Sequence, residues 1–299
     1  MSQSLNNIAV VIASIGRPDA LADCVAMLSS QTRKPDRIVF SVTGEKDLPV
    51  AECLEGVEVV VGPKGLPAQR NNGMEQVLGD SDVIVFFDDD YIASSHAIER
   101  LLNFFNTHQD VVGVTGHLLA DGIHGPGIST QEALDMVSRY DADVPALDCT
   151  ILDDLDGLYG CNMAYRAAAI GNVRFDTNLP LYAWQEDIDF AAALRQASGG
   201  RIVKSHVFAG VHRGAKGGRT SGTKLGYSQI ANPIYLMRKG TMTGRFGRRL
   251  MMRNFIANHV KMLRPEPWVD RWGRVKGNWI GLADWTRRRL SPGRILDMK

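Results

Sequence analysis

Apolar and polar positions alternate along the first half of the chain with two different periods. Nearly continuous apolar runs predict buried strands, whereas the segments between them carry apolar residues at helical spacing, such as Leu21, Val25 and Leu28. The alternation predicts an α/β fold, a mostly parallel sheet flanked by helices on both faces. The predicted strands are Ile8–Ala13, Arg37–Val42, Val57–Val61, Val83–Phe87 and Val111–Thr115.

Ligands of such sheets bind beyond the carboxyl ends of the strands. Three segments reach that edge in the predicted fold: Ser14–Arg17, the loop after Val42, and the three aspartates that follow Phe87. Between Asp121 and Tyr159 the pattern loosens, and its Gly, Asp and Pro residues predict a long excursion near the site.

Charge is distributed unevenly, although the formal net charge of the chain is only +1. Residues 1–234 hold 18 Lys and Arg against 29 Asp and Glu, whereas residues 235–299 hold 16 against 4 and carry four of the five tryptophans. We therefore predict two parts, an α/β ligand-binding domain at 1–235 and a basic, Trp-rich helical extension at 236–299.

The basic extension has several interpretations. Trp combined with Arg and Lys suits an anionic membrane surface. Helices packed on the acidic domain, or a homodimer contact, fit the same composition equally well. We expect no nucleic acid partner, because no nucleic-acid motif accompanies the charge.

Composition is that of a soluble globular protein, with 299 residues, 44% hydrophobic and 22% charged. No apolar run is long enough to span a bilayer, and no basic segment precedes the N-terminal apolar stretch, as it does in a signal peptide. The four cysteines lack CxxC spacing, which is typical of a reducing compartment. They are Cys24, Cys53, Cys149 and Cys161. We expect a cytoplasmic protein, peripheral at the inner face of the cell membrane if the extension binds lipid.

Three carboxylates, Asp88, Asp89 and Asp90, follow directly after the predicted strand Val83–Phe87. Like charges this close raise one another's pKa and destabilise the fold unless something offsets them. Mg²⁺ and Mn²⁺ take hard oxygen ligands and keep phosphate oxygens in their shell, so a divalent cation with a diphosphate would offset the repulsion. A solvated acidic turn is the alternative, and the buried strand immediately before the triplet disfavours it.

A second acidic cluster, Glu186 and Asp187, lies where a helix begins, with Trp184 just upstream. A helix N-terminus stabilises carboxylates, so a charged first turn is one interpretation. An aromatic ring beside a carboxylate is also how proteins hold sugar rings, and a carboxylate held there can remove a proton from a hydroxyl. At this point both interpretations, a charged first turn and a sugar-binding site with a proton-accepting carboxylate, stay open.

The segment Phe208–Gly222 is rich in glycine and carries His212, Arg213, Lys216 and Arg219. A flexible basic segment with one histidine suits a diphosphate and its metal. A single histidine is more often structural than a ligand, but the two preceding acidic clusters favour a binding role here.

Together these segments resemble the inverting family 2 glycosyltransferases, which have the Rossmann-like GT-A fold, from Ile8 to Lys239. The opening VVIASIGRPDALADCVAMLSSQT resembles the family's first strand, Arg-Pro turn and first helix, and FFDDDYI resembles its DxD motif. GPKGLPAQRNNGM resembles the nucleotide-contacting segment and GLYGCNMAYR the strand that lines the acceptor sugar. WQEDIDF resembles the ED motif, and GVHRG the late metal-binding histidine.

The resemblance implies a role for each matching residue. Asp90 and His212 would bind the metal, Mn²⁺ or Mg²⁺, and Asp187 would be the general base. Nucleotide contacts would come from Ser14, Arg17, Lys64, Arg70, Asp88 and Asp89, and acceptor contacts from Gly160, Asn162, Trp184 and Glu186. After the second strand, where many members carry a base-contacting Asp, this chain has VFSVTGEKDLP, with Ser41, Thr43, Glu45 or Asp47 instead.

The implied activity is a metal-dependent, inverting glycosyltransferase of the hexosyltransferase type. It would move a sugar from a nucleotide diphosphate sugar to a hydroxyl of a glycan or lipid-linked acceptor, in surface polysaccharide synthesis. A sugar nucleotidyltransferase is an alternative, but such enzymes open with a Gly-rich loop that SIGRPDAL fits poorly. A non-catalytic membrane-surface adaptor of the same fold is a second alternative, against which Asp187 and Asp88–Asp90 argue.

Overall fold

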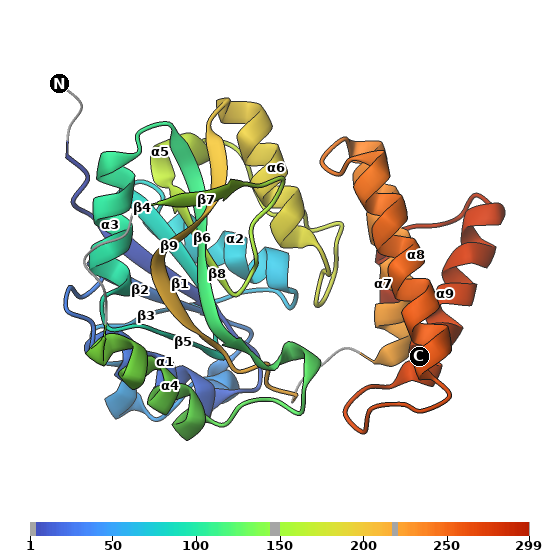
Figure 1. The fold of residues 1–299 in the computed structure, drawn as a ribbon, viewed down its shortest axis with the longest axis horizontal. Helices are drawn as coiled ribbons and strands as arrows, with labels where there is room; N and C mark the ends of the chain where they lie inside the picture. The colour runs from blue at the N-terminus through green and yellow to red at the C-terminus, as the bar shows by residue number, and fades with distance from the viewer. Residues whose placement is uncertain (1–3, 144–149, 217–220, 299) are drawn as a thin grey trace.

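The computed structural model describes residues 4–143, 150–216 and 221–298, so Cys149 and Arg219 lie outside the described residues. An α/β domain lies beside a layer formed by three long helices of the described C-terminal region (Figure 1). The strands are β1 Ile8–Ala13, β2 Arg37–Val42, β3 Glu58–Val61, β4 Val83–Asp88, β5 Tyr91–Ala93, β6 Val111–Asp121, β7 Ile151–Asp154, β8 Asn162–Arg166 and β9 Arg201–His212. The α-helices are α1 Pro18–Ser29, α2 Leu66–Val77, α3 Ala97–Thr107, α4 Thr130–Ala142, α5 Ala167–Ile170, α6 Glu186–Ser198, α7 Gly222–Lys239, α8 Gly244–Lys261 and α9 Arg271–Thr286. Short 3-10 helices lie at Glu45–Asp47, Ala51–Leu54, Gly122–His124 and Pro292–Leu296.

The sheet has the strand order β3-β2-β1-β4-β8-β6-β9-β5, and β7 pairs with β9. Strands β3, β2, β1 and β4 are parallel, and so are β6 and β9. Strand β8 runs antiparallel between β4 and β6, and β5 and β7 run antiparallel to β9. The predicted α/β fold is confirmed, with a sheet that is parallel in its first half and mixed in its second.

Helices cover both faces of the sheet, as the apolar runs predicted. In β1, Ile8, Val10 and Ile12 pack into one core cluster, whereas Ala9 and Val11 pack into the other. The first cluster includes apolar residues of α1 and α3, and the second includes residues of α2 and α6. Because both faces are buried, the strand is apolar throughout instead of alternating with polar residues.

The predicted long excursion after Asp121 contains regular structure. Strand β6 extends to that residue, and helix α4 begins at a capping box in which the side chains of Ser129 and Glu132 bond each other's backbone N–H groups. The Ser-x-x-Glu spacing is the local signal that could have located this helix start, whereas the Gly, Asp and Pro content predicted an irregular excursion here. Residues 144–149 of the segment lie outside the described residues.

The helical layer is built on a close crossing of α7 and α9. A Cβ on Gly226 would lie 2.1 Å from the backbone oxygen of Arg274, and one on Gly277 would lie 2.1 Å from that of Thr223. The predicted domain boundary between residues 235 and 236 falls inside α7. Within the described part of the chain, no helix has both the length and the apolar character needed to cross a membrane.

An ion pair and hydrogen bonds connect the helical layer to the start of α6. The fully buried carboxylate of Asp189 lies 2.7 Å from Lys239 Nζ and accepts a hydrogen bond from Thr241 Oγ1 at 2.5 Å. Asn232 Nδ2 in α7 donates to the backbone oxygen of Trp184 at 2.8 Å. The helical layer therefore holds the segment that carries Glu186 and Asp187.

Candidate active site

The negative charges of the adjacent aspartates at the end of β4 are balanced by cationic side chains of the protein itself. Asp88 Oδ1 lies 2.8 Å from Arg70 Nη2. Asp89 accepts hydrogen bonds from Arg17 Nη1 at 2.7 Å and Ser14 Oγ at 2.6 Å. Burial raises the pKa of Asp88 and of Asp89, and the guanidinium partners oppose that shift. Parallel pairing of β1 with β4 brings the segment after β1 and the aspartates to one edge of the sheet, as predicted. Nucleotide contacts of Ser14 and Arg17 stay a prediction.

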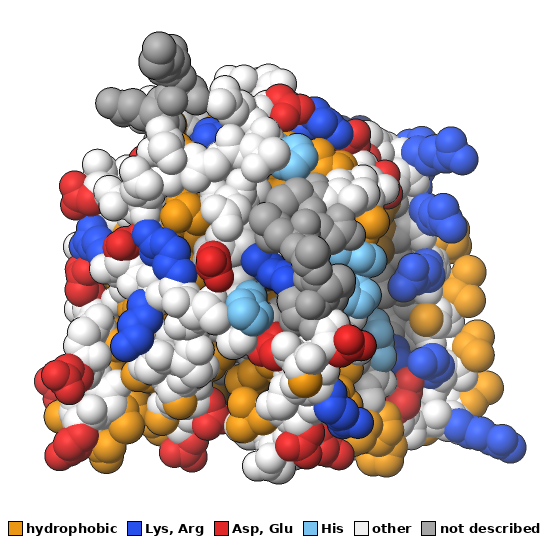
Figure 2. Space-filling view, turned by 60° about the vertical axis from the view of Figure 1, so that its left-hand side comes forward, with side chains coloured by type: hydrophobic (Ala, Val, Ile, Leu, Met, Phe, Trp, Pro, Cys, Tyr) orange, Lys and Arg blue, Asp and Glu red, His pale blue; other side chains and the backbone are white. Residues whose placement is uncertain are grey.

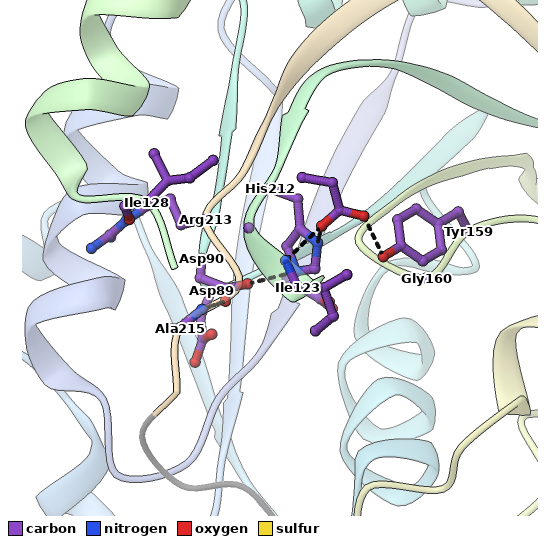
Figure 3. Close-up of polar contacts among 12 residues, drawn as sticks. Asp89, Asp90, Ile123, Ile128, Tyr159, Gly160, His212, Arg213 and Ala215 are labelled. Carbon is purple, nitrogen blue, oxygen red and sulfur yellow. Dashed lines mark hydrogen bonds and ion pairs between the residues drawn. The ribbon is translucent and has the colours of Figure 1, made fainter. Parts of the chain in front are cut away.

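The third aspartate, Asp90, faces His212. Its Oδ1 lies 3.4 Å from His212 Nε2, and its Oδ2 accepts the N–H of Ala215 at 2.7 Å. On the other side of the ring, His212 Nδ1 lies 2.9 Å from Asp121 Oδ1, whose Oδ2 accepts a hydrogen bond from the Tyr159 hydroxyl at 3.0 Å (Figure 3). Burial alone would lower the pKa of His212, but the bonds to Asp121 and Asp90 raise it to about 10. The imidazolium therefore balances Asp90 in the protein without metal.

Asp88, Asp90 and His212 fit a divalent cation. One ligand atom from each lies within 4.8 Å of the others. Carboxylates suit Mg²⁺ and Mn²⁺, and an imidazole in the set favours Mn²⁺ over Mg²⁺. The bond from the second ring nitrogen to Asp121 is the outer-shell arrangement that orients metal-binding histidines.

Asp121 is a site residue that the sequence analysis missed. Strands β6 and β9 run parallel with Asp121 beside His212 in register, although 91 residues separate them. Nothing local in the sequence marks this pairing.

Arg70 in α2 joins the aspartate cluster to the second acidic cluster. Its guanidinium is buried, forms an ion pair with Glu186 Oε1, and donates through Nη2 to both Asp88 and the backbone oxygen of Gly160. Burial would lower the pKa of Arg70, but the carboxylates of Glu186 and Asp88 raise it. Nucleotide contacts by Arg70, and by the exposed Lys64 before α2, stay predictions.

Asp187 is held in the first turn of α6 by backbone N–H groups. Gly160 N–H donates to Oδ2 and Ile188 N–H to Oδ1, both at 2.9 Å. Burial raises the pKa of Asp187, and these bonds oppose the shift. A Cβ on Gly160 would lie 3.1 Å from Asp187 Oδ2, so glycine leaves room for the carboxylate. An oriented carboxylate with a raised pKa suits a general base.

The loop before α6 is strained. Leu181, Ala183 and Gln185 all have positive φ, at 60°, 50° and 78°. Such conformations cost of order 1–3 kcal/mol each and cluster at functional sites. Trp184 lies within this loop and is half-buried, and the acceptor contact of its ring stays a prediction.

Three of the four predicted acceptor residues, Gly160, Asn162 and Glu186, are buried in the structure, and two of them are buried through their side chains. Asn162 in β8 has no exposed surface; its side chain accepts from Thr115 Oγ1 and donates to the Tyr91 hydroxyl. Glu186 is 3% exposed against Arg70. Their burial argues against direct acceptor contact and for roles in bracing the sheet and Arg70.

The family model described as glycosyl transferase family 2 matches residues 9–171, more than half of the chain. The chain belongs to glycosyl transferase family 2. The prediction of a glycosyltransferase is thereby confirmed at the level of the family. Within this family 2 domain lie Arg70, Asp88–Asp90 and Gly160, whereas Asp187 and His212 lie beyond the matched residues.

Solved structures with similar folds support the GT-A assignment. TarS 1-349 from S. aureus aligns with a TM-score of 0.55 and 13% identity, covering 97% of this chain and 82% of that one. Its complex with UDP-GlcNAc aligns at 0.52 and 11%, covering 95% and 93%. Glucosyl-3-phosphoglycerate synthase from Mycobacterium tuberculosis, in complex with Mn²⁺, UDP-Glc and phosphoglyceric acid, aligns at 0.52 and 16%, covering 78% and 80%. The chain spans 40% of the longer TarS chain, and no curated relative matches it.

Proposed function

We propose that this family 2 glycosyltransferase transfers a sugar from a nucleotide diphosphate sugar to a hydroxyl of a glycan or lipid-linked acceptor, with inversion at the anomeric carbon. One observation carries the proposal. Arg70 contacts Asp88, which belongs to the cluster suited to a cation, and it also contacts the Gly160 backbone oxygen and Glu186, the residue before Asp187. Arg70 therefore lies between that cluster and the segment that carries Asp187.

Each residue then has a separate task. Asp187 accepts the proton of the acceptor hydroxyl, whose oxygen attacks the anomeric carbon on the face opposite the diphosphate. The bond between that carbon and the diphosphate oxygen breaks, and one displacement inverts the centre. Asp88, Asp90 and His212 would hold Mn²⁺ or Mg²⁺, which when bound supplies positive charge against the departing diphosphate. Trp184 would stack on the acceptor ring.

The neighbouring structures support a UDP-sugar donor and Mn²⁺. TarS 1-349 is in complex with UDP-GlcNAc, and the mycobacterial synthase is in complex with UDP-Glc and Mn²⁺. The glycan or lipid-linked acceptor, and with it surface polysaccharide synthesis in the cytoplasm or at the membrane, is proposed from the basic extension alone.

A thermal-shift and product-release screen tests the proposal. We expect UDP-sugars to raise the melting temperature in the presence of Mn²⁺ and not after chelation. Asp90→Ala should remove this Mn²⁺-dependent shift, whereas Asp154→Ala, at an exposed strand end, should retain it. Release of UDP without any nucleoside triphosphate would exclude a nucleotidyltransferase, and NMR of the product would give its anomeric configuration. No shift and no release with UDP-, GDP- or dTDP-sugars would overturn the proposal.

A further inference from the structure

The outward side of α8 combines exposed aliphatic and exposed basic residues. Met252, Ile256 and Val260 follow one another at intervals of four residues on α8, and Leu263 comes three residues later, in the turn after the helix; Val260 and Leu263 are 64% and 76% exposed. Residues at this spacing share one side of a helix. The exposed arginines on this side of α8 are Arg245, Arg248, Arg249 and Arg253.

These arginines carry positive charge that the described residues leave unbalanced. In the described part of the chain, no carboxylate lies within 4.0 Å of any of them. Some other cations of the helical layer are paired there: Lys261 and Arg271 with Glu266, and Arg289 with Asp284. The α8 face therefore does not pack on the acidic α/β domain.

Helix α9 adds exposed indole rings beside this face. Trp279 Nε1 donates to His259 Nε2 at 3.0 Å, and its ring lies 5.5 Å from that of Phe255, so α9 meets α8 along this edge. Trp279 and Trp272 are 56% and 64% exposed, with the exposed Lys276 between them. Figure 2 shows hydrophobic and basic side chains together along its right-hand edge, in agreement with this distribution.

We propose that the α8–α9 face, formed by the α8 residues above and Leu263 with Trp272, Lys276 and Trp279, docks on an anionic lipid bilayer with α8 lying in the plane of the headgroups. Basic residues suit anionic headgroups, aliphatic residues enter the acyl boundary, and Trp lies at the level between them. A two-fold dimer through this face would bring like charges of the two copies together. A nucleic acid phosphate backbone makes no favourable contact with exposed aliphatic side chains, and this disfavours nucleic acid as the partner of the face.

Vesicle flotation with the full chain tests this proposal without any turnover, so its result is independent of the proposed reaction. We expect binding to phosphatidylcholine vesicles that contain phosphatidylglycerol, and weak binding to phosphatidylcholine alone. Arg248→Gln/Arg249→Gln should weaken partitioning by about 25-fold at low salt, since each basic residue near an anionic surface is worth about fivefold. Ile256→Gln/Val260→Gln should weaken it by at least about tenfold at both low and high salt.

Matched controls lie in the α/β domain. Lys34→Gln/Lys46→Gln removes two exposed charges, and Val50→Gln/Leu152→Gln removes two exposed apolar side chains; both should partition like the parent chain. Circular dichroism confirms that each variant is folded. Failure of the parent chain to bind anionic vesicles, or unchanged binding by both α8 variants, would overturn the proposal. A dimer in light scattering that the α8 variants dissociate, without an effect on vesicle binding, would assign the face to self-association instead.

Discussion

His212 and Asp121 lie side by side at the ends of two parallel strands, 2.9 Å apart between Nδ1 and Oδ1. The carboxylate fixes the imidazole so that Nε2 faces Asp90. The candidate metal site thus depends on a residue that is not itself one of its three candidate ligands, Asp88, Asp90 and His212.

Asp121→Asn should weaken Mn²⁺ binding by about 10- to 100-fold, because it removes the charge that raises the basicity of His212 as a ligand. Calorimetric titration with Mn²⁺ measures this directly. Asp156→Asn, which alters a carboxylate in a surface ion pair with Arg195, is the control and should bind Mn²⁺ normally. Equal Mn²⁺ affinity in Asp121→Asn and the parent would mean that Asp121 does not orient a ligand.

His212 should stabilise the metal-free fold in a pH-dependent way. Its pKa is raised from 6.5 to about 10 in the folded chain, so its contribution to the free energy of unfolding is complete below about pH 6.5 and is lost as pH rises through about 10. The stability difference between the parent and His212→Asn, measured by urea unfolding with a chelator, should therefore shrink over this range. A difference that stays constant or grows with pH would exclude a charged His212 in the metal-free fold.

Asp187→Asn should lower turnover by about 10²–10⁴-fold while donor affinity stays unchanged, since an amide cannot accept the acceptor's proton. Glu186→Gln should retain most of the turnover, because Glu186 is buried against Arg70. A transfer assay with titrated donor compares the two variants. An active Asp187→Asn beside an inactive Glu186→Gln would make Glu186 the base, and activity in both would place the base elsewhere in the chain.

Arg70→Met should lower the free energy of unfolding by about 3–5 kcal/mol, because it leaves the buried Glu186 and the partly exposed Asp88 without their cation. Adding Glu186→Leu should recover part of that loss, since one of the two uncompensated carboxylates is then gone. Urea unfolding of the two single variants and the double variant measures the coupling. Strictly additive effects would show that the buried pair contributes no interaction energy.

The sequence alone determined the parallel half of the sheet. Strands β1 and β2 lie at the predicted residues, β3 begins one residue later, and β4 ends one residue later. The central strands β1 and β4 are buried on both faces and therefore need a local apolar run, which the sequence displays. The Asp88–Asp90 triplet at a strand end is equally local. The Ser129 and Glu132 capping box was also present in the sequence, and α4 follows from it.

Only the tertiary structure decided which distant strands and side chains contact the strands and aspartates that the sequence predicted. The position of β8 between β4 and β6, the register that places Asp121 beside His212, and the reach of Arg70 to Asp88 and Glu186 all join segments far apart in the chain. Helical and strand periods report which face of an element is buried, but not which distant element covers it. That choice depends on the summed packing of the whole core, and so the compensation of the three aspartates by Arg70, Arg17 and His212 could not be derived from their neighbours in sequence.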